Sequence, residues 1–181
     1  PFADVNENQW FYDSVMYAYN NGLMNGVSAD KFNPSENGSR GMLVTVLYNL
    51  EGRPDAATNE FEDVEDGKWY TDSIAWAAGN NIISGYGNGL FGPSDNITRE
   101  QMAVIFYRYA KFKGYDLSEK ASLDSFTDGN GVSSWADEAM QWMVGSGMMN
   151  GKGNGLLGPK GTATRAEMAA ILQRFAEKFK N

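Results

Sequence analysis

Ile97-Thr98-Arg99-Glu100-Gln101-Met102 occurs in three versions along the chain, and each version predicts the start of a helix. A second copy is Ala163-Thr164-Arg165-Ala166-Glu167-Met168, and a weaker one is Gly38-Ser39-Arg40-Gly41-Met42-Leu43. In the two stronger copies, a Thr stands three residues before a Gln or Glu. This spacing predicts a capping box, in which each side chain bonds a backbone N–H of the other residue. The weak copy has Met42 in place of the Gln or Glu, so only half of its cap is expected.

The same stretches place Arg40, Arg99 and Arg165 at the first position of each helix. A cation is unusual there, because the helix dipole already gives that end about half a positive charge. One interpretation is that each arginine binds an anionic ligand. The other is that each arginine forms an ion pair within the protein, with Asp13, Asp72 or Glu138 near the start of another predicted helix. These stretches alone leave both interpretations open.

Composition excludes several classes of function. The 181 residues include no cysteine and no histidine, which removes disulfides, Ser-His-Asp and Cys-His catalysis, and histidine-based zinc sites. Fifteen basic residues stand against 23 acidic ones, so the net charge is −8 and neither nucleic acid nor an anionic membrane is an expected partner. No apolar run approaches a membrane span. Because the chain starts at Pro1 without a signal peptide, we expect it to be part of a larger protein.

Three copies of one unit account for almost the whole chain. A shift of 59 residues superposes the first unit on the second, and a further shift of 66 superposes the second on the third, where one extra residue precedes Trp135. The predicted repeats are residues 1–52, 61–114 and 126–181, joined by linkers at about 53–60 and 115–125. The repeated positions include Trp10, Trp69 and Trp135, and later Gly26, Gly85 and Gly151.

Each unit predicts two helices separated by a Gly- and Asn-rich loop. The first helices are expected at 12–21, 71–80 and 137–146, with Gly22, Asn81 and Gly147 as their stop signals. The second helices follow the capping stretches and carry apolar residues at helical period, as Met102, Ile105, Phe106 and Tyr109 do. One unit cannot bury such a stripe alone. We therefore expect a mainly α protein, a pseudo-threefold trimer of helix-loop-helix repeats around a central three-helix bundle.

These residues resemble the S-layer homology (SLH) family. The resemblance rests on the Phe-x-Asp-Val opening, the following Trp, the Gly-rich loop with Phe-x-Pro, and the Thr-Arg-x-Glu helix start, which Thr164–Glu167 keeps unaltered. It implies a cell-wall anchor on the outside of a bacterium. Such domains bind secondary cell wall polysaccharide in grooves between the repeats, and the sugar often carries a pyruvate ketal on N-acetylmannosamine. The resemblance favours the ligand interpretation of the motif arginines.

The predicted site residues fall into two groups. For the ligand carboxylate they are Arg40, Arg99 and Arg165. For sugar hydroxyls and the groove they are Asp13, Asp72, Glu138, Trp10, Trp69, Trp135, Gly26, Gly85, Gly151 and Tyr86. Among these, the repeated tryptophans fit a core position better than a sugar platform. The glycines fit pure turn geometry as well as close approach to a ligand, and Tyr86 could stack on a sugar.

Three other functions compete with the anchor interpretation. Carboxylate pairs could cleave glycosides, but no distinctive motif supports an enzyme. The Asp128-Gly-Asn130-Gly-Val132 loop fails the EF-hand pattern at Val132, which has no side-chain oxygen. A helical scaffold that binds peptides is the serious alternative. The sequence therefore predicts a non-catalytic, monomeric wall anchor that needs no cofactor and no metal.

Overall fold

The computed structural model describes residues 1–180 and is mainly helical, which confirms the predicted fold class. Within this range there is no strand, only isolated β-bridges. The last residue of the predicted third repeat, Asn181, lies outside the described residues. No helix in residues 1–180 is long and apolar enough to cross a bilayer. The elements are α1 (Tyr12–Asn20), α2 (Arg40–Leu50), α3 (Thr71–Gly79), α4 (Arg99–Lys113), the short 3₁₀ helices η1 (Gly129–Gly131) and η2 (Ser134–Ala136), α5 (Asp137–Gly145) and α6 (Arg165–Phe179).

The second helix of each repeat begins where its capping stretch predicts. Arg40, Arg99 and Arg165 are the first residues of α2, α4 and α6. Both predicted capping boxes are present at the starts of α4 and α6, and at the start of α2 only the Ser39 side chain caps, accepting from the Met42 N–H. The local sequence therefore determines these three helix starts.

The first helix of each repeat ends one residue earlier than expected. Residues Asn21, Asn80 and Ser146 are the C-caps rather than helical residues. The predicted stop signals that follow all have a left-handed backbone, with φ values of 65° at Gly22, 58° at Asn81 and 75° at Gly147. This geometry ends a helix and turns the chain into the Gly-rich loop.

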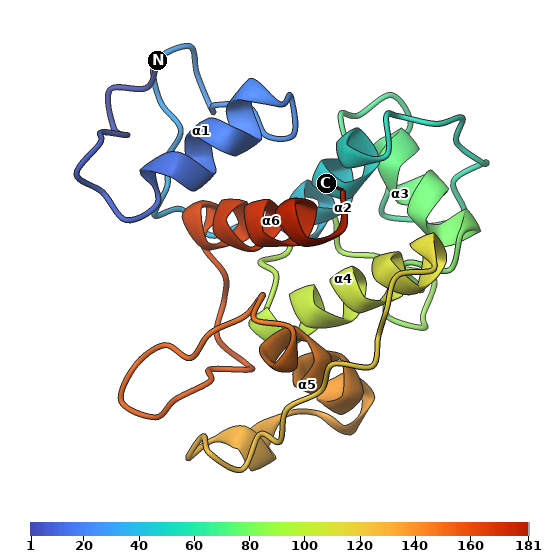
Figure 1. Ribbon diagram of the computed structural model, residues 1–181. Helices are drawn as coiled ribbons and strands as arrows, with labels where there is room; N and C mark the ends of the chain where they lie inside the picture. The colour runs from blue at the N-terminus through green and yellow to red at the C-terminus, as the bar shows by residue number, and fades with distance from the viewer. Residues whose placement is uncertain (181) are drawn as a thin grey trace.

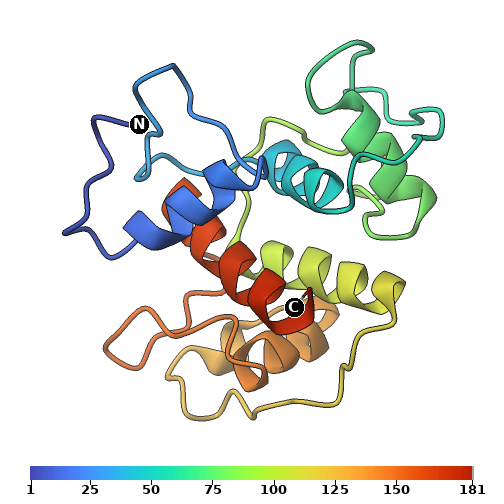
Figure 2. The same cartoon turned by 45° about the horizontal axis from the view of Figure 1, so that its top comes forward.

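The core lies where α2, α4 and α6 meet, and Figure 2 shows these three helices in the middle of the molecule with α1, α3 and α5 outside them. Their predicted apolar stripes are buried, and Leu43, Met102 and Met168 have no exposed surface. Aromatic rings join α4 to α6, since the Phe106 and Phe175 ring centroids lie 5.3 Å apart. The stripes that no repeat could bury alone are thus buried against one another.

The two helices of a repeat do not pair with each other but with the neighbouring repeats. The main contacts join α2 to α3, α4 to α5 and α6 to α1, as Figure 1 shows. The second helix of every repeat thus packs on the first helix of the next, and the third repeat returns to the first. The predicted helices and loops are present in each repeat. That each second helix packs on the first helix of the next repeat was not predicted.

The loops follow the same cyclic order as the helices. At the start of α2, Arg40 donates its backbone N–H to Asp95 and Gly41 donates to Pro93, both in the loop of the second repeat. Equivalent bonds tie the start of α4 to the third repeat and the start of α6 to the first, ending on Gly161, Pro159, Glu36 and Pro34. These recurring bonds support a pseudo-threefold arrangement, which itself stays a prediction.

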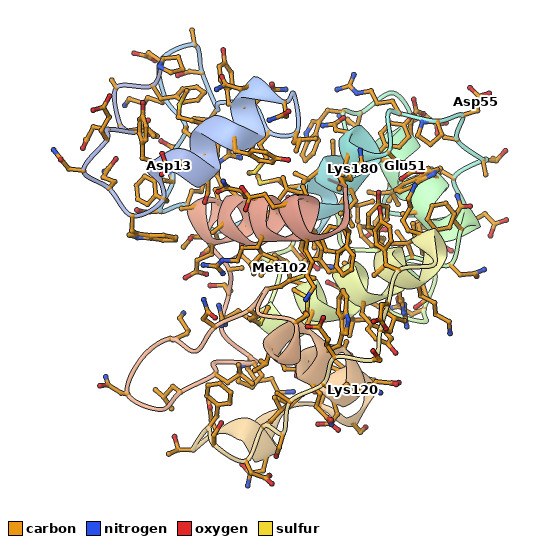
Figure 3. The ribbon with its side chains drawn as sticks, viewed as in Figure 1. Asp13, Glu51, Asp55, Met102, Lys120 and Lys180 are labelled. Atoms are coloured by element: carbon orange, nitrogen blue, oxygen red, sulfur yellow. The ribbon has the colours of Figure 1, made fainter. Side chains whose placement is uncertain are left out.

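A polar cluster closes the far end of the central bundle. The Glu51 carboxylate accepts from the Tyr109 hydroxyl at 2.7 Å and from Lys113 Nζ at 2.9 Å. Lys180 Nζ donates to the Leu50 carbonyl at 2.5 Å, and Figure 3 shows Glu51 and Lys180 close together at this end. Because Tyr109 is fully buried, its hydroxyl needs such a partner.

Candidate functional site

Three grooves lie between the repeats, and each contains one motif arginine. We name them the Arg40, Arg99 and Arg165 grooves, with volumes of about 420, 280 and 510 Å³. These volumes are close to or within the range of small-ligand sites. Each groove is lined by the motif arginine, the Gly-rich loop of the next repeat, the exposed face of that repeat's second helix, and one repeated tryptophan.

All three repeats contribute to every groove. The Arg40 groove combines Arg40 of the first repeat, Gly85 and Tyr86 of the second, and Trp135 of the third. In the Arg99 groove the tryptophan is Trp10, and the loop residues are Gly151 and Lys152. In the Arg165 groove the tryptophan is Trp69, and the loop residues are Gly26 and Val27. The structure therefore brings together the predicted arginines, tryptophans and glycines, but in combinations that the linear repeat does not reveal.

The motif arginines are buried, and their partners are backbone carbonyls rather than carboxylates. Arg40, Arg99 and Arg165 are 6%, 5% and 4% exposed. Their Nε atoms donate to Phe91, Leu157 and Phe32 carbonyls at 2.9, 2.9 and 2.8 Å. No ion pair in residues 1–180 includes any of the three. The alternative of an ion pair with Asp13, Asp72 or Glu138 is therefore wrong, because the arginines lie against loops of other repeats.

The terminal nitrogens of the arginines differ in what they bond. In Arg99, Nη2 donates to the Asn150 carbonyl at 2.6 Å. In Arg165, Nη2 donates to the Asn25 carbonyl at 2.7 Å and Nη1 contacts the Met42 sulfur at 3.2 Å. Arg40 instead lies between two rings, with Cζ 4.4 Å from the Tyr86 centroid and 4.6 Å from that of Phe91. Each guanidinium carries five N–H groups, so donors remain for a ligand in every groove.

Burial lowers the pKa of each motif arginine, and nearby carboxylates oppose the shift. For Arg99 the opposing groups are Glu167 and Asp128, and for Arg165 they are Glu36 and Asp4. Arginine is so strong a base that these side chains still carry a full charge at neutral pH. Three buried cations thus face the grooves of a protein whose net charge is −8.

The Phe-x-Asp opening of each repeat supplies a clamp whose role the sequence did not reveal. Asp4 accepts from the backbone N–H groups of Phe32 and Asn33 at 2.9 and 2.8 Å. Asp63 and Asp128 each accept two equivalent bonds from the loops at 91–92 and 157–158. The residue whose N–H bonds the aspartate also offers its carbonyl to a motif arginine. Each loop is therefore held from both sides, which fixes the groove wall.

The repeated tryptophans are exposed, which corrects the preferred core interpretation. Trp10, Trp69 and Trp135 are 67%, 62% and 59% exposed. Trp10 and Trp69 contact the rings of the neighbouring Phe11 and Tyr70, and the tryptophans that are buried in the core are Trp76 and Trp142. A large apolar ring left in water at the rim of a polar groove is typical of a binding surface. Their predicted position in the grooves fits this exposure.

The loop glycines are required by close approach within the protein. A Cβ added at Gly26, Gly85 or Gly151 would lie 2.5, 2.6 or 2.9 Å from a ring carbon of Phe2, Phe61 or Phe126. Only Gly85 of the three also has a positive φ, at 70°. Packing of the Phe-x-Asp phenylalanine under the loop therefore explains all three glycines, and their N–H contact with a ligand stays a prediction.

The predicted acids do not lie with the arginines. Asp13 and Asp72 are exposed near the starts of α1 and α3, and Figure 3 labels Asp13 on α1. Glu138 pairs with Lys120 at 2.7 Å on the surface of α5. None of the three is among the residues that line the grooves. Their predicted contact with sugar hydroxyls therefore has no support from the geometry.

A second arginine stands in each groove, and sequence reasoning missed it. Arg108 of α4 lines the Arg40 groove and donates to the Ser84 hydroxyl at 3.3 Å. Arg174 of α6 lines the Arg99 groove and donates to the Met148 carbonyl at 3.0 Å. Arg108 and Arg174 are separated by the repeat shift of 66, so the sequence could have identified them as equivalent positions. In the Arg165 groove the aligned residue is Asn49, and Arg53 supplies the second cation.

Glu100 anchors the segment that presents Trp135. This carboxylate is 3% exposed and accepts from the Ser133 N–H and hydroxyl, both at 2.9 Å. Lys160 Nζ donates to it at 2.8 Å and lies against the Ser133 hydroxyl. Because α4 belongs to the second repeat, these bonds fix a tryptophan of the third repeat at the Arg40 groove.

Asp128, in the loop that was compared with an EF-hand, has a structural role. Asp128 accepts the two backbone N–H groups described above, so its oxygens already have protein partners. In residues 1–180, no three Asp or Glu side chains converge in a way that could hold a metal ion. The side chains that line the grooves offer guanidinium, ammonium, carboxylate, amide, hydroxyl and aromatic groups.

Comparison with known proteins identifies the repeats. A family model described as the S-layer homology domain matches residues 1–41, 60–103 and 125–169. The exoglucanase XynX of Acetivibrio thermocellus is 33% identical over 99% of this chain, which covers 16% of that protein. The surface-layer 125 kDa protein of Lysinibacillus sphaericus is 29% identical over 91% of the chain and 14% of that protein. A cellulosome-anchoring protein of Acetivibrio thermocellus is 24% identical over 86% of the chain and 36% of that protein.

Proposed function

The chain belongs to the S-layer homology domain family, and from this premise we propose that it is a non-catalytic anchor that binds an anionic sugar of a cell-wall polysaccharide in its three grooves. Relatives named as surface-layer and cellulosome-anchoring proteins support this anchoring role. The family also indicates a location at the bacterial cell surface. Because the chain covers at most 36% of the three relatives described above, the anchored cargo would lie in other parts of a longer protein.

One observation carries the proposal. Each groove combines a buried motif arginine, a second arginine and an exposed tryptophan. Glu167 is the single carboxylate among the residues that line the three grooves, and it is engaged in the capping box of α6. Local positive charge on a protein of net charge −8 supports the proposal that these grooves bind anions.

The chemistry of a sugar acid fits this combination. A guanidinium binds a carboxylate through short charge-assisted bonds, and a helix N-terminus adds a favourable dipole. An exposed indole offers a flat apolar face for the C–H face of a sugar ring. The hydroxyl of Ser84 and the amides of Gln101 and Asn150 can bond sugar hydroxyls. A pyruvate ketal on N-acetylmannosamine provides a carboxylate, a ring face and hydroxyls together.

Calorimetric titration with purified pyruvylated wall polysaccharide tests this proposal. Substitution of the motif arginines is a poor test, because they hold the loops and the variants would unfold more easily. Arg108→Gln and Trp135→Ala change the Arg40 groove at side chains that are more exposed than the motif arginine. Each loss removes a charge-assisted bond or a ring contact, so we expect affinity for that groove to fall about tenfold. Arg174→Gln and Trp10→Ala are the equivalent pair in the Arg99 groove.

Lys111→Gln is the matched control, since Lys111 is an exposed cation on the same helix as Arg108 and does not line a groove. It should leave affinity unchanged. Polysaccharide stripped of its pyruvate should bind the parent weakly. If the groove variants bind as the parent does, the grooves are not the receptor, and a scaffold that binds protein partners becomes the better account. Because a polymer repeats its epitope, loss of one groove should also reduce avidity.

A further inference from the structure

The three grooves differ in the residue that follows the repeated loop glycine. This position holds Val27 in the Arg165 groove, Tyr86 in the Arg40 groove and Lys152 in the Arg99 groove. All three side chains are exposed and line their grooves. An apolar, an aromatic and a cationic side chain thus occupy the same place beside the motif arginine.

Tyr86 covers Arg40 from the solvent side. Its ring centroid is 4.4 Å from Arg40 Cζ, and its hydroxyl donates to Asp95 Oδ2 at 2.7 Å. A Cβ added at Gly92 would lie 2.6 Å from the Tyr86 oxygen, so the ring runs across Gly92. Burial and the bond to Asp95 raise the pKa of Tyr86 to about 12, and the ring is neutral at physiological pH. The Arg40 groove therefore offers an aromatic surface and no extra charge at this point.

Lys152 follows the same course beside Arg99. A Cβ added at Gly158, which aligns with Gly92, would lie 2.8 Å from Lys152 Cδ and 3.8 Å from Arg99 Cδ. The ammonium end reaches toward Gly161, whose added Cβ would lie 3.9 Å from Lys152 Nζ. Gly161 aligns with Asp95, so the carboxylate that engages Tyr86 has no counterpart here. Lys152 takes part in no ion pair within residues 1–180.

The Arg99 groove thus presents three cations, Arg99, Arg174 and Lys152, beside one carboxylate, Glu167, which accepts the Thr164 N–H in the capping box of α6. The Nε and Nη2 atoms of Arg99 donate to the Leu157 and Asn150 carbonyls, and within residues 1–180 Nη1 has no hydrogen-bond partner. Because the Lys152 and Arg99 side chains both pass Gly158, the flexible ammonium can reach a second negative group on a ligand whose carboxylate binds Arg99. This arrangement suits a ligand with more than one negative charge.

We propose that the residue after the loop glycine selects the ligand of each groove, and that Lys152 makes the Arg99 groove the site for a sugar ligand with two negative charges. The Arg40 groove, with Tyr86, takes a sugar with one carboxylate and a ring face. This inference rests on the proposed function of the grooves. The second charge can come from a phosphate ester on the sugar or from a carboxylate on the next sugar of the polymer.

NMR titration tests the proposal, because the indole N–H of Trp10 reports on the Arg99 groove and that of Trp135 on the Arg40 groove. Three probes are used: singly pyruvylated N-acetylmannosamine, the same sugar with a phosphate ester, and a disaccharide with two pyruvate ketals. For the parent, we expect at least one doubly charged probe to bind at Trp10 about fivefold tighter than the single-charge probe, from one partly exposed ion pair. No such preference is expected at Trp135. The probe that shows the preference identifies the source of the second charge.

A reciprocal exchange supplies the decisive variants. Both side chains are exposed, so Lys152→Tyr and Tyr86→Lys should fold as the parent does. Lys152→Tyr should abolish the preference at Trp10. Tyr86→Lys combined with Asp95→Gly, which removes the carboxylate that would pair with the new ammonium, should create one at Trp135, while Lys111→Gln should change neither. If Trp10 keeps its preference in Lys152→Tyr, or binds both classes of probe equally in the parent, this inference is overturned. If neither indole responds to any probe, the proposed function itself fails.

Discussion

Each motif arginine stabilises the fold and lines a groove with the same side chain. In each, Nε holds the carbonyl of a loop in another repeat, while the rest of the guanidinium faces a groove. The position of these arginines at a helix start could be predicted, because a capping box spans only four residues. Their partners could not, since Arg165 and Phe32 lie 133 residues apart in sequence. The sequence suggested carboxylates as partners of the motif arginines, whereas the fold provides backbone carbonyl oxygens.

Replacing Arg165 by Gln should destabilise the protein even without ligand. The change leaves the buried carbonyl of Phe32 and that of Asn25 without their charged donor, which we expect to cost about 3 kcal/mol in free energy of unfolding. Urea unfolding followed by circular dichroism measures this loss. Arg174→Gln is the comparison, because Arg174 is half-buried and the expected loss is about 1 kcal/mol. Equal losses in the two variants would contradict the structural role of Arg165.

The Phe-x-Asp clamp makes stability depend on pH. The two backbone N–H bonds hold the pKa of Asp128 below its usual 3.8, and the corresponding bonds lower the pKa of Asp4 although burial opposes the shift. A carboxyl with a lowered pKa in the folded state stabilises the fold above its unfolded pKa. This stabilisation is lost as the pH falls through the folded pKa.

Asp128→Asn should therefore melt at a lower temperature than the parent at pH 7, and the difference should shrink below about pH 4. Differential scanning calorimetry at pH 7, 5, 4 and 3 records the two curves. Asp66→Asn is a suitable control, because Asp66 is exposed and has no hydrogen bond among those of the described chain. A constant difference at all four pH values would show that the clamp does not act through its charge.

Among the elements, the helices were easier to predict than the loops. The first helices end within one residue of the predicted bounds because Gly and Asn stop signals act locally. The shape of the Gly-rich loops depends instead on a phenylalanine about 24 residues earlier in the same repeat, as Phe61 and Gly85 show. The sequence shows that both residues recur in every repeat, but it does not show that the phenylalanine ring packs against the glycine.

Gly85→Ala and Gly87→Ala separate loop geometry from packing. Both glycines have a positive φ, 70° and 86°, so alanine costs about 1–2 kcal/mol at either position. A Cβ at Gly85 would also meet Phe61 at 2.6 Å and the Leu90 carbonyl at 2.7 Å, whereas a Cβ at Gly87 meets nothing within 4 Å. Gly85→Ala should lower the free energy of unfolding by at least about 1 kcal/mol more. Chemical denaturation of both variants checks this, and equal losses would remove the packing argument.

For the molecule as a whole, the exchange of helix partners matters most. The repeat period predicted three units and a shared core, since each apolar stripe needs a cover. It could not tell that α1 packs on α6, because equivalent positions look alike in sequence. The grooves could not be predicted for the same reason. A repeated tryptophan has the same spacing in sequence whether it lies in the core of its own repeat or at the rim of a groove formed by the other repeats. Exposure of Trp10, Trp69 and Trp135 follows from this arrangement.

A chain that lacks the third repeat should not fold as a smaller version of the protein. Residues 1–124 retain α1 but lose α6, so the fully buried Val15 and Ala18 would lose their cover. We expect the full chain to unfold in one transition with coincident circular dichroism and tryptophan fluorescence. The shortened chain should lose that transition or melt well below it. A cooperative transition at the same temperature would mean that the repeats are independent.

The central claim is that every groove is built from all three repeats and receives an anionic sugar. NMR titration of Arg108→Gln with pyruvylated wall oligosaccharide tests it, read at the indole N–H signals of Trp10, Trp69 and Trp135. Arg108 and Trp69 belong to the same repeat, but Arg108 and Trp135 line the same groove. The account predicts that about tenfold more ligand is needed for the same shift of Trp135, while the titrations of Trp10 and Trp69 are unchanged. Loss of the Trp69 response with an intact Trp135 response would contradict it.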